Sequence, residues 1–151
     1  MTITVNGLGE LRKLAGGDLG SSEWIEVTQE RVDTFADATG DHQWIHVDPG
    51  RAKEGPFGAP IAHGYLTLSL FIPLFTELLD VRGVTTKVNY GLDKVRFPSP
   101  VKVGSRIRLT ARLDEVEDVP GGAQITVAGT IEIEGAAKPA AVLRSLSRFY
   151  A

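Results

Sequence analysis

The chain has 151 residues, of which 42% are hydrophobic and 23% charged, which is typical of one globular domain spanning residues 1–151. It contains no cysteine, which excludes disulfides, thiolate metal ligands and a cysteine nucleophile, and suits a cytoplasmic protein. The net charge of -3 argues against a general binder of nucleic acid or anionic membranes. The N-terminus has no basic region followed by an apolar run, so no signal peptide is expected.

The first forty residues predict a strand followed by a helix. Residues 1–20 are rich in glycine and weakly patterned, and we interpret them as a lead-in segment. Residues 22–27 alternate polar and apolar side chains, as a strand does. Thr28 is a favourable N-cap for a helix over residues 29–39, and Gly40 is typical of the residue that ends one.

The middle of the chain predicts a loop and then a long apolar helix. Residues 41–58 have the composition of a loop. A helix is expected over residues 64–79, with a kink at Pro73, which has no N–H to donate. The apolar stretch around it is interrupted well short of the ~18 residues that a membrane span needs, so a buried core helix is expected.

The last 65 residues predict strands. Residues 106–113 and 124–134 alternate apolar and polar side chains, and residues 141–150 do so more weakly. The alternation changes phase within residues 88–97, which predicts a β-bulge near residues 91–94. The order of elements favours an α+β fold in which an antiparallel sheet packs on one long helix.

The densest group of reactive side chains follows Gly40. Asp41 and His46 lie five residues apart in a segment that is free to curl after the helix ends, so their side chains can converge. A carboxylate beside an imidazole is a common acid–base pair. The alternative from the residues alone is that Asp41 caps a turn and His46 is a loop histidine with an ordinary partner.

Other chemistries have weaker support. His42, His46 and Asp48 are possible ligands for a first-row metal, but no helix or hairpin is expected to hold them at that spacing, so no metal site is predicted. The chain has no P-loop, no dinucleotide fingerprint, no HExxH and no GxSxG. Nucleotide-driven, hydride-transfer and serine-hydrolase activities therefore lose support.

The start of the long helix is the second candidate site. Gly64 opens this helix without a side chain, so an oxygen atom can approach the free backbone amides there, as in an oxyanion site. The alternative is that Gly64 only permits close packing. We expect the preceding His63 to be a structural hydrogen-bonding residue rather than a catalyst.

A basic stretch follows between residues 94 and 112, with no acid inside it. Its members are Lys94, Arg96, Lys102, Arg106, Arg108 and Arg112. The last three fall on the polar face of one predicted strand and could meet the phosphates of a coenzyme. The alternative is an ordinary solvated strand face.

Three stretches resemble a known family: residues 38–48, 55–64 and 89–103. They resemble the MaoC-like family, which includes the (R)-specific enoyl-CoA hydratases, and within it the nodulation-protein-N-like branch. The resemblance covers residues 22–150, nearly the whole chain. It implies a hot-dog fold, in which an antiparallel sheet wraps around a central helix, usually in a homodimer.

The resemblance also implies a site. The family motif runs Gly-Asp, a variable residue, Asn-Pro, an apolar residue and His, which places its catalytic Asp on Asp41 and its catalytic His on His46. The glycine whose amide contacts the thioester carbonyl falls on Gly64. Gln43 and Trp44 stand where the family has Asn and Pro, which changes the expected shape of the neighbouring pocket.

The implied reaction is the reversible syn addition of water to a (2E)-enoyl-CoA, giving an (R)-3-hydroxyacyl-CoA in fatty-acid metabolism. Asp41, the expected base, and His46 would hold one water, while the Gly64 N–H holds the thioester oxygen. The expected partner is an acyl-CoA thioester, with neither nucleic acid nor a membrane. No metal or organic cofactor is expected.

The long helix also offers candidates for an acyl-binding tunnel. Tyr65, Leu68 and Ile72 could line such a tunnel or belong to the core. Two other functions stay open: a hot-dog acyl-CoA thioesterase and a non-catalytic binder of acyl thioesters. The thioesterase needs a carboxylate on or beside the central helix, which has no acid before Glu77.

Overall fold

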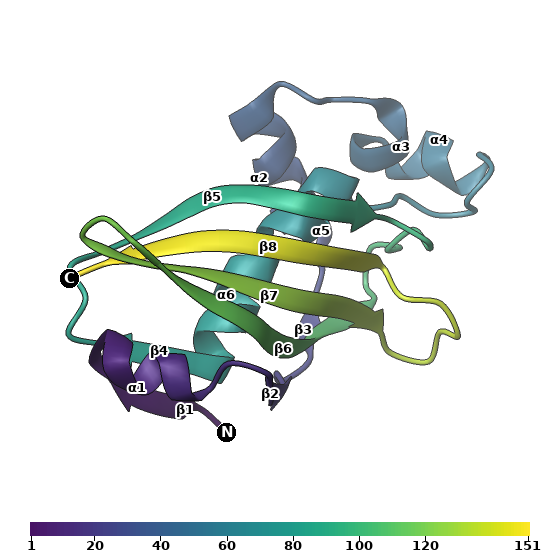
Figure 1. Cartoon of the computed structure of the whole chain (residues 1–151). Helices are drawn as coiled ribbons and strands as arrows, with labels where there is room; N and C mark the ends of the chain where they lie inside the picture. The colour runs from purple at the N-terminus through teal and green to yellow at the C-terminus, as the bar shows by residue number, and fades with distance from the viewer.

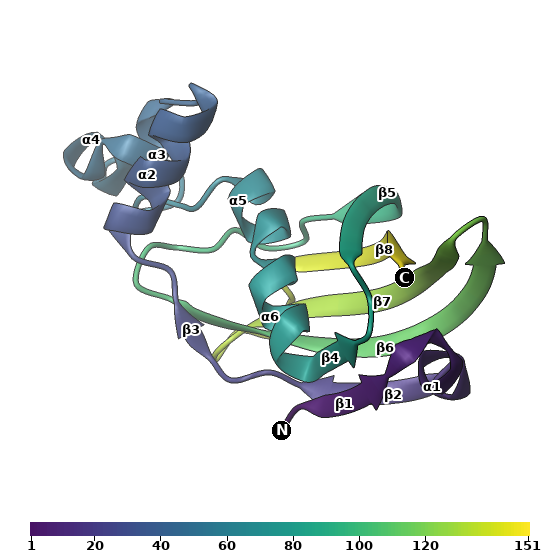
Figure 2. The same cartoon turned by 90° about the vertical axis from the view of Figure 1, so that its left-hand side faces the viewer.

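The computed structural model describes residues 1–151 and consists of a curved antiparallel sheet with a helical rod across its concave side (Figure 1, Figure 2). In the larger sheet the strand order is β2-β6-β7-β8-β5, and β3 also pairs with β6. This arrangement confirms the α+β hot-dog class. The elements are β1 (Ile3–Asn6), α1 (Gly7–Lys13), β2 (Gly17–Ser21), β3 (Ile25–Glu26), α2 (Gln29–Thr39), α3 (Trp44–Val47), α4 (Pro49–Lys53), α5 (Gly64–Ser69), α6 (Phe71–Leu78), β4 (Leu79–Arg82), β5 (Thr86–Arg96), β6 (Arg106–Val119), β7 (Gly122–Ile133) and β8 (Ala141–Tyr150).

The helical rod is formed by α5 and α6, and its interruption falls at Leu70 rather than at Pro73. Pro73 cannot donate a hydrogen bond to the Ser69 carbonyl, and its ring crowds that oxygen. The first helix therefore ends at Ser69, and Pro73 takes a place in the first turn of α6, where no N–H is needed. The sequence predicted one kinked helix where the structure has two. Neither of them, nor any other helix, is long and apolar enough to cross a bilayer.

The predicted strands at the C-terminal end are present. The inward-facing side chains of β6, β7 and β8 pack on the rod as part of one core cluster of 27 buried residues. The pairing of β5 with β8 shifts register between Asn89 and Gly91 and again between Leu92 and Lys94, which confirms the predicted bulge.

The N-terminal segment is part of the packed fold and not a lead-in. Residues 1–20 form β1, α1 and most of β2, and three of their side chains, Val5, Leu11 and Leu19, are buried in the core cluster. Strand β1 runs parallel to β4, which follows the rod directly. The segment thus covers the end of the rod that lies away from α2, α3 and α4 (Figure 2).

Helix α2 begins and ends where the sequence predicts. The Thr28 hydroxyl accepts a hydrogen bond from the Arg31 N–H at 3.1 Å, and Gly40 leaves the helix with a φ of 83°. The strand expected over residues 22–27 is shorter, since only Ile25 and Glu26 pair with β6.

Residues 41–58, expected to be a loop, contain the short helices α3 and α4. Asp48 caps α4, because its carboxylate accepts a hydrogen bond from the Arg51 N–H at 3.1 Å. Pro49 occupies the first helical position, where a missing N–H has no cost. The same Asp-Pro-Gly sequence is typical of turns, which is why the helix was missed.

Close packing of the rod on the sheet yields a test at Gly129. A Cβ atom there would lie 3.1 Å from Leu109 Cδ1 and 3.2 Å from a Phe71 ring carbon. We expect Gly129→Ala to lower the free energy of unfolding by about 1–3 kcal/mol through overpacking, measured by urea denaturation. The control is Gly9→Ala in α1, where a Cβ meets nothing within 4 Å and a small gain in stability is expected. Equal stabilities of the two variants would contradict the tight contact.

Candidate active site

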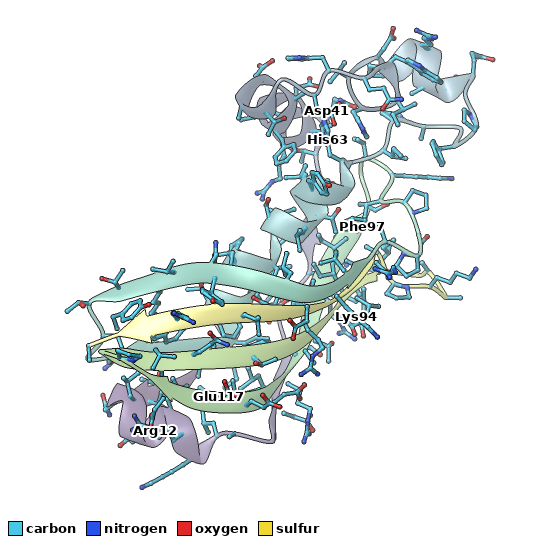
Figure 3. The ribbon with its side chains drawn as sticks, turned by 45° about the horizontal axis from the view of Figure 1, so that its top comes forward. Arg12, Asp41, His63, Lys94, Phe97 and Glu117 are labelled. Atoms are coloured by element: carbon cyan, nitrogen blue, oxygen red, sulfur yellow. The ribbon has the colours of Figure 1, made fainter.

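Two chain segments meet at the outer end of the helical rod. The first is the 41–47 bend, which follows α2 and continues into α3; the second is the 61–64 segment, which leads into α5. Figure 3 shows Asp41 and His63 together at this end of the molecule, with Phe97 nearby. The two segments enclose a hollow of about 280 Å³, which we call the catalytic hollow. Its lining residues are Asp41, His46, His63, Gly64, Tyr65 and Phe97.

His46 is buried and oriented by a backbone carbonyl. Its Nδ1–H donates a hydrogen bond to the Ile61 carbonyl at 2.6 Å, which leaves Nε2 as an acceptor. The Ile61 N–H in turn donates to the Ile45 carbonyl at 3.0 Å, so the two segments are tied at this point. Burial lowers the pKa of His46 below its usual 6.5, and the neighbouring His63 lowers it further. The hydrogen bond to Ile61 and the charge of Asp41 oppose this shift without reversing it, so the ring is neutral at neutral pH.

His63 contacts both members of the predicted pair. Its Nε2–H donates to the backbone carbonyl of Asp41 at 2.9 Å, and its ring stacks on His46 with the ring centroids 3.9 Å apart. The Phe35 ring packs on it at a tilt, with a centroid distance of 4.9 Å. His63 is buried and is a hydrogen-bonding residue, as predicted, but its contacts link it directly to the candidate site.

The Asp41 carboxylate is exposed beside the two imidazoles. One of its oxygens and a ring nitrogen from each of His46 and His63 all lie within 4.8 Å of one another. A water molecule that donates both protons spans two acceptors about 4.5 Å apart. The structure thus brings Asp41 and His46 close enough to hold one water between them.

The arrangement of the rings fits a water better than a metal ion. An imidazole nitrogen directs its lone pair in the plane of its ring, and two rings that are stacked at 3.9 Å and tilted by only 24° cannot both point at one ion. The other possible ligand set is not assembled. His42 bonds to Asp37 at 3.0 Å, a contact that raises the pKa of His42, and Asp48 caps α4.

Gly64 opens α5 with a backbone amide that has no acceptor, and it also packs closely on a neighbouring ring. It is the first residue of α5, and neither its N–H nor that of Tyr65 donates to any acceptor. A Cβ at this position would lie 3.1 Å from the Phe97 ring, so the glycine also permits close packing. Gly64 lines the same hollow as Asp41 and His46.

The three predicted tunnel residues line two separate hollows. Tyr65 lines the catalytic hollow and is 72% exposed. Leu68 and Ile72 line a hollow of about 260 Å³ between the rod and β5. Phe97 was missed by the sequence analysis, and its place within the third family-like stretch, residues 89–103, was the only available signal.

Of the two residues that depart from the family motif, Gln43 and Trp44, the tryptophan is held by two neighbouring residues. Trp44 packs so closely on Gly55 that a Cβ there would lie 2.8 Å from a Trp44 ring carbon. The Arg51 guanidinium lies over the Trp44 ring, 4.3 Å from its centroid. The bend is therefore held by an aromatic anchor in place of a proline.

All three of the predicted phosphate-binding arginines take part in ion pairs. Arg106 forms an ion pair with Glu134, and Arg108 forms one with Glu132 at 2.6 Å. The Arg108 guanidinium also lies over the Trp24 ring. These two residues follow the solvated strand alternative, with cross-strand ion pairs.

Comparisons with known proteins agree with this geometry. A sequence profile described as MaoC like domain matches residues 11–136. The chain is 54% identical to 3-hydroxyacyl-thioester dehydratase Z of Mycobacterium tuberculosis, over 98% of this chain and 99% of that protein. It is 48% identical to nodulation protein N of Rhizobium leguminosarum bv. viciae, over 88% of this chain and 84% of that protein.

Among solved structures, an (R)-hydratase from A. caviae involved in PHA biosynthesis matches with a TM-score of 0.72 and 25% identity, over 88% of this chain and 94% of that one. The fold, the profile match and the identity to curated relatives lead to one conclusion. This chain belongs to the MaoC-like dehydratase family and is an enzyme of the hydratase–dehydratase class.

Proposed function

We propose that this enzyme is an (R)-specific enoyl-CoA hydratase that adds water reversibly to (2E)-enoyl-CoA thioesters in fatty-acid metabolism. The observation that carries the proposal is the placement of three groups around one hollow: the Asp41 carboxylate, the imidazole of His46 and the free amide of Gly64. The names of the dehydratase and (R)-hydratase relatives support the same chemistry.

In the proposed mechanism, one water donates one hydrogen bond to the Asp41 carboxylate and one to Nε2 of His46. Asp41 takes a proton as the water oxygen bonds to C3 of the enoyl thioester, and His46 orients the water. Negative charge moves to the thioester oxygen, where the Gly64 N–H stabilises it. The proton on Asp41 then passes to C2 from the same face, which gives syn addition; dehydration is the reverse.

The first test removes the proposed base. We expect Asp41→Asn to lower kcat for hydration of crotonyl-CoA by about 10²–10⁴-fold, because an amide cannot take the water's proton. The loss of absorbance of the enoyl band measures the rate. Asp37→Asn is the matched control, since Asp37 is exposed on α2 and outside the catalytic hollow. Equal activities of the two variants would reject the assignment.

The second test is the pH dependence. His46 must be neutral to accept a hydrogen bond from the water, and its pKa lies below 6.5 because burial disfavours the charged ring. Activity should therefore hold as the pH falls to 6.5 and decline only at lower pH, through the lowered pKa. The kcat/KM profile of the free enzyme measures this. A rise in activity on acidification would mean that the protonated ring is the active form.

No observation favours the thioesterase alternative. Glu77, the first acid on the rod, accepts a hydrogen bond from the Glu23 N–H at 2.7 Å, near the N-terminal segment. It lies outside the catalytic hollow. A non-catalytic acyl-thioester binder would show no turnover in the crotonyl-CoA assay described above.

We also propose that the enzyme is a homodimer joined along β5. This strand lies at the edge of the sheet, and all of its residues except Val95 are exposed. Val88, Tyr90 and Leu92 are large apolar side chains that are each more than 40% exposed. An edge strand has backbone N–H and C=O groups without partners, and here its apolar side chains are also exposed. Pairing with β5 of a second copy would satisfy these groups and extend the sheet.

The proposed dimer predicts the effect of charge at this edge. We expect Val88→Glu to shift the molecular mass measured by light scattering from dimer to monomer, because it places like charges at the interface. Val142→Glu is the control, because Val142 is equally exposed, at 43%, but lies on β8 rather than on the edge strand. A monomeric wild-type enzyme at assay concentration would contradict the proposal.

A further inference from the structure

The outer face of the sheet carries a second hollow, of about 430 Å³, which we call the basic hollow. Its side chains alternate with the core residues along β6, β7 and β8, so they face away from the rod. The cations that line it are Lys94, Arg96, Arg112 and Arg144. Short outward-facing side chains lie between these cations, among them Thr110, Ala128 and Thr130.

The strand register explains why this surface is concave. Lys94 pairs across the strands with Arg144, Arg144 with Ala128, and Ala128 with Arg112. The short side chain of Ala128 therefore lies between two long guanidinium side chains. This arrangement leaves space above Ala128, and the N–H donors of Arg112 and Arg144 border that space on two sides.

Two of the four cations are held in place by carboxylates. Asp114 lies 2.7 Å from Arg144 and 3.3 Å from Arg112, and Asp18 lies 3.5 Å from Arg112. An arginine has five N–H donors, so these ion pairs orient the guanidinium groups without using every donor.

The other two cations have no acidic partner. Lys94 makes no hydrogen bond or ion pair, and Arg96 donates only to the carbonyl of its neighbour Val95. The basic hollow thus has positive charge that the protein does not neutralise, although the whole chain carries a net charge of -3. Such a local excess of one sign attracts an anionic ligand.

The basic hollow lies close to the catalytic hollow. Arg96 ends β5 and precedes Phe97, whose ring packs against Gly64. Figure 3 shows Lys94 and Phe97 at the same end of the sheet, with Phe97 nearer to Asp41. The chain from Lys94 to Phe97 advances by three residues, which span roughly 10 Å when extended. One elongated ligand can therefore reach both hollows.

We propose that the basic hollow binds the phosphate groups of the nucleotide end of a CoA thioester, while the acyl end lies at Asp41 and His46. This inference rests on the proposed hydratase function. Guanidinium and ammonium groups form charge-assisted hydrogen bonds to phosphate oxygens, and arginine does so through two parallel donors. A small concave site suits a compact nucleotide better than the broad surface of an acidic carrier protein.

The decisive variant is Lys94→Gln/Arg96→Gln, because it removes the two unpaired cations and leaves the ion pairs of Arg112 and Arg144 intact. We expect its KM for crotonyl-CoA to rise about tenfold at low ionic strength with kcat unchanged, since hydrogen bonds to charged groups contribute at least that much. For the N-acetylcysteamine thioester of crotonate, which has no phosphate, kcat/KM should stay the same.

The control variant is Lys13→Gln/Lys138→Gln, which removes the same charge from two exposed lysines outside the basic hollow. It should keep the wild-type KM for both substrates. An unchanged KM of the Lys94/Arg96 variant for crotonyl-CoA, or an equal loss on both thioesters, would overturn the proposal. If the wild-type enzyme turned over crotonate bound to a carrier protein but not crotonyl-CoA, the proposal would be overturned in favour of a carrier-protein substrate.

Binding of adenosine 3′,5′-bisphosphate, measured by calorimetry, tests the site without turnover. The wild-type enzyme should bind it, more weakly as salt rises, and the Lys94/Arg96 variant should bind it at least tenfold more weakly. No binding to the wild type would overturn the phosphate site. Binding without turnover of any thioester would support the phosphate site and reject the hydratase proposal, so the two failures are distinguishable.

Discussion

The geometry of the catalytic hollow depends on two hydrogen bonds from imidazole rings to backbone carbonyls. His46 in the bend donates to Ile61, and His63 in the lead-in to α5 donates to Asp41, so the two bonds cross between the segments in opposite directions. The stacked rings fill the space between them. The bend cannot move without breaking both hydrogen bonds and separating the rings. Each of these changes costs free energy, because buried polar groups would lose their partners.

This constraint sets the chemistry as well as the shape. Because a carbonyl can only accept, each ring must carry its proton on the bonded nitrogen, which leaves Nε2 of His46 free. Burial keeps that ring neutral, while Asp41 stays exposed at the opening of the hollow. The hollow therefore has two acceptors, the buried Nε2 of His46, which is held in place, and the exposed carboxylate of Asp41. Gly64 lines the same hollow. The proposed hydratase mechanism and the proposed phosphate site both build on that placement.

Local signals predicted the parts of the molecule that local interactions decide. The Thr28 cap and the Gly40 helix end fixed where the bend starts, and the alternation of the C-terminal strands fixed the sheet. Caps and alternating patterns do not predict contacts between residues that are far apart in the sequence. The stacking of His63 on His46 joins residues 17 positions apart, residues 1–20 are ordered by pairing with β4, and Arg144 reaches the basic hollow from the last strand.

The protonation state of His46 tests the central claim most directly, because the tautomer follows from the crossed hydrogen bonds. Nitrogen-15 NMR of the imidazole rings near neutral pH reports which nitrogen carries the proton. Our account predicts a neutral His46 ring with its proton on Nδ1 and a bare Nε2. A neutral ring with its proton on Nε2 would mean that His46 does not donate to Ile61. A proton on Nε2, in a neutral or a charged ring, would mean that His46 cannot accept a hydrogen bond from a shared water.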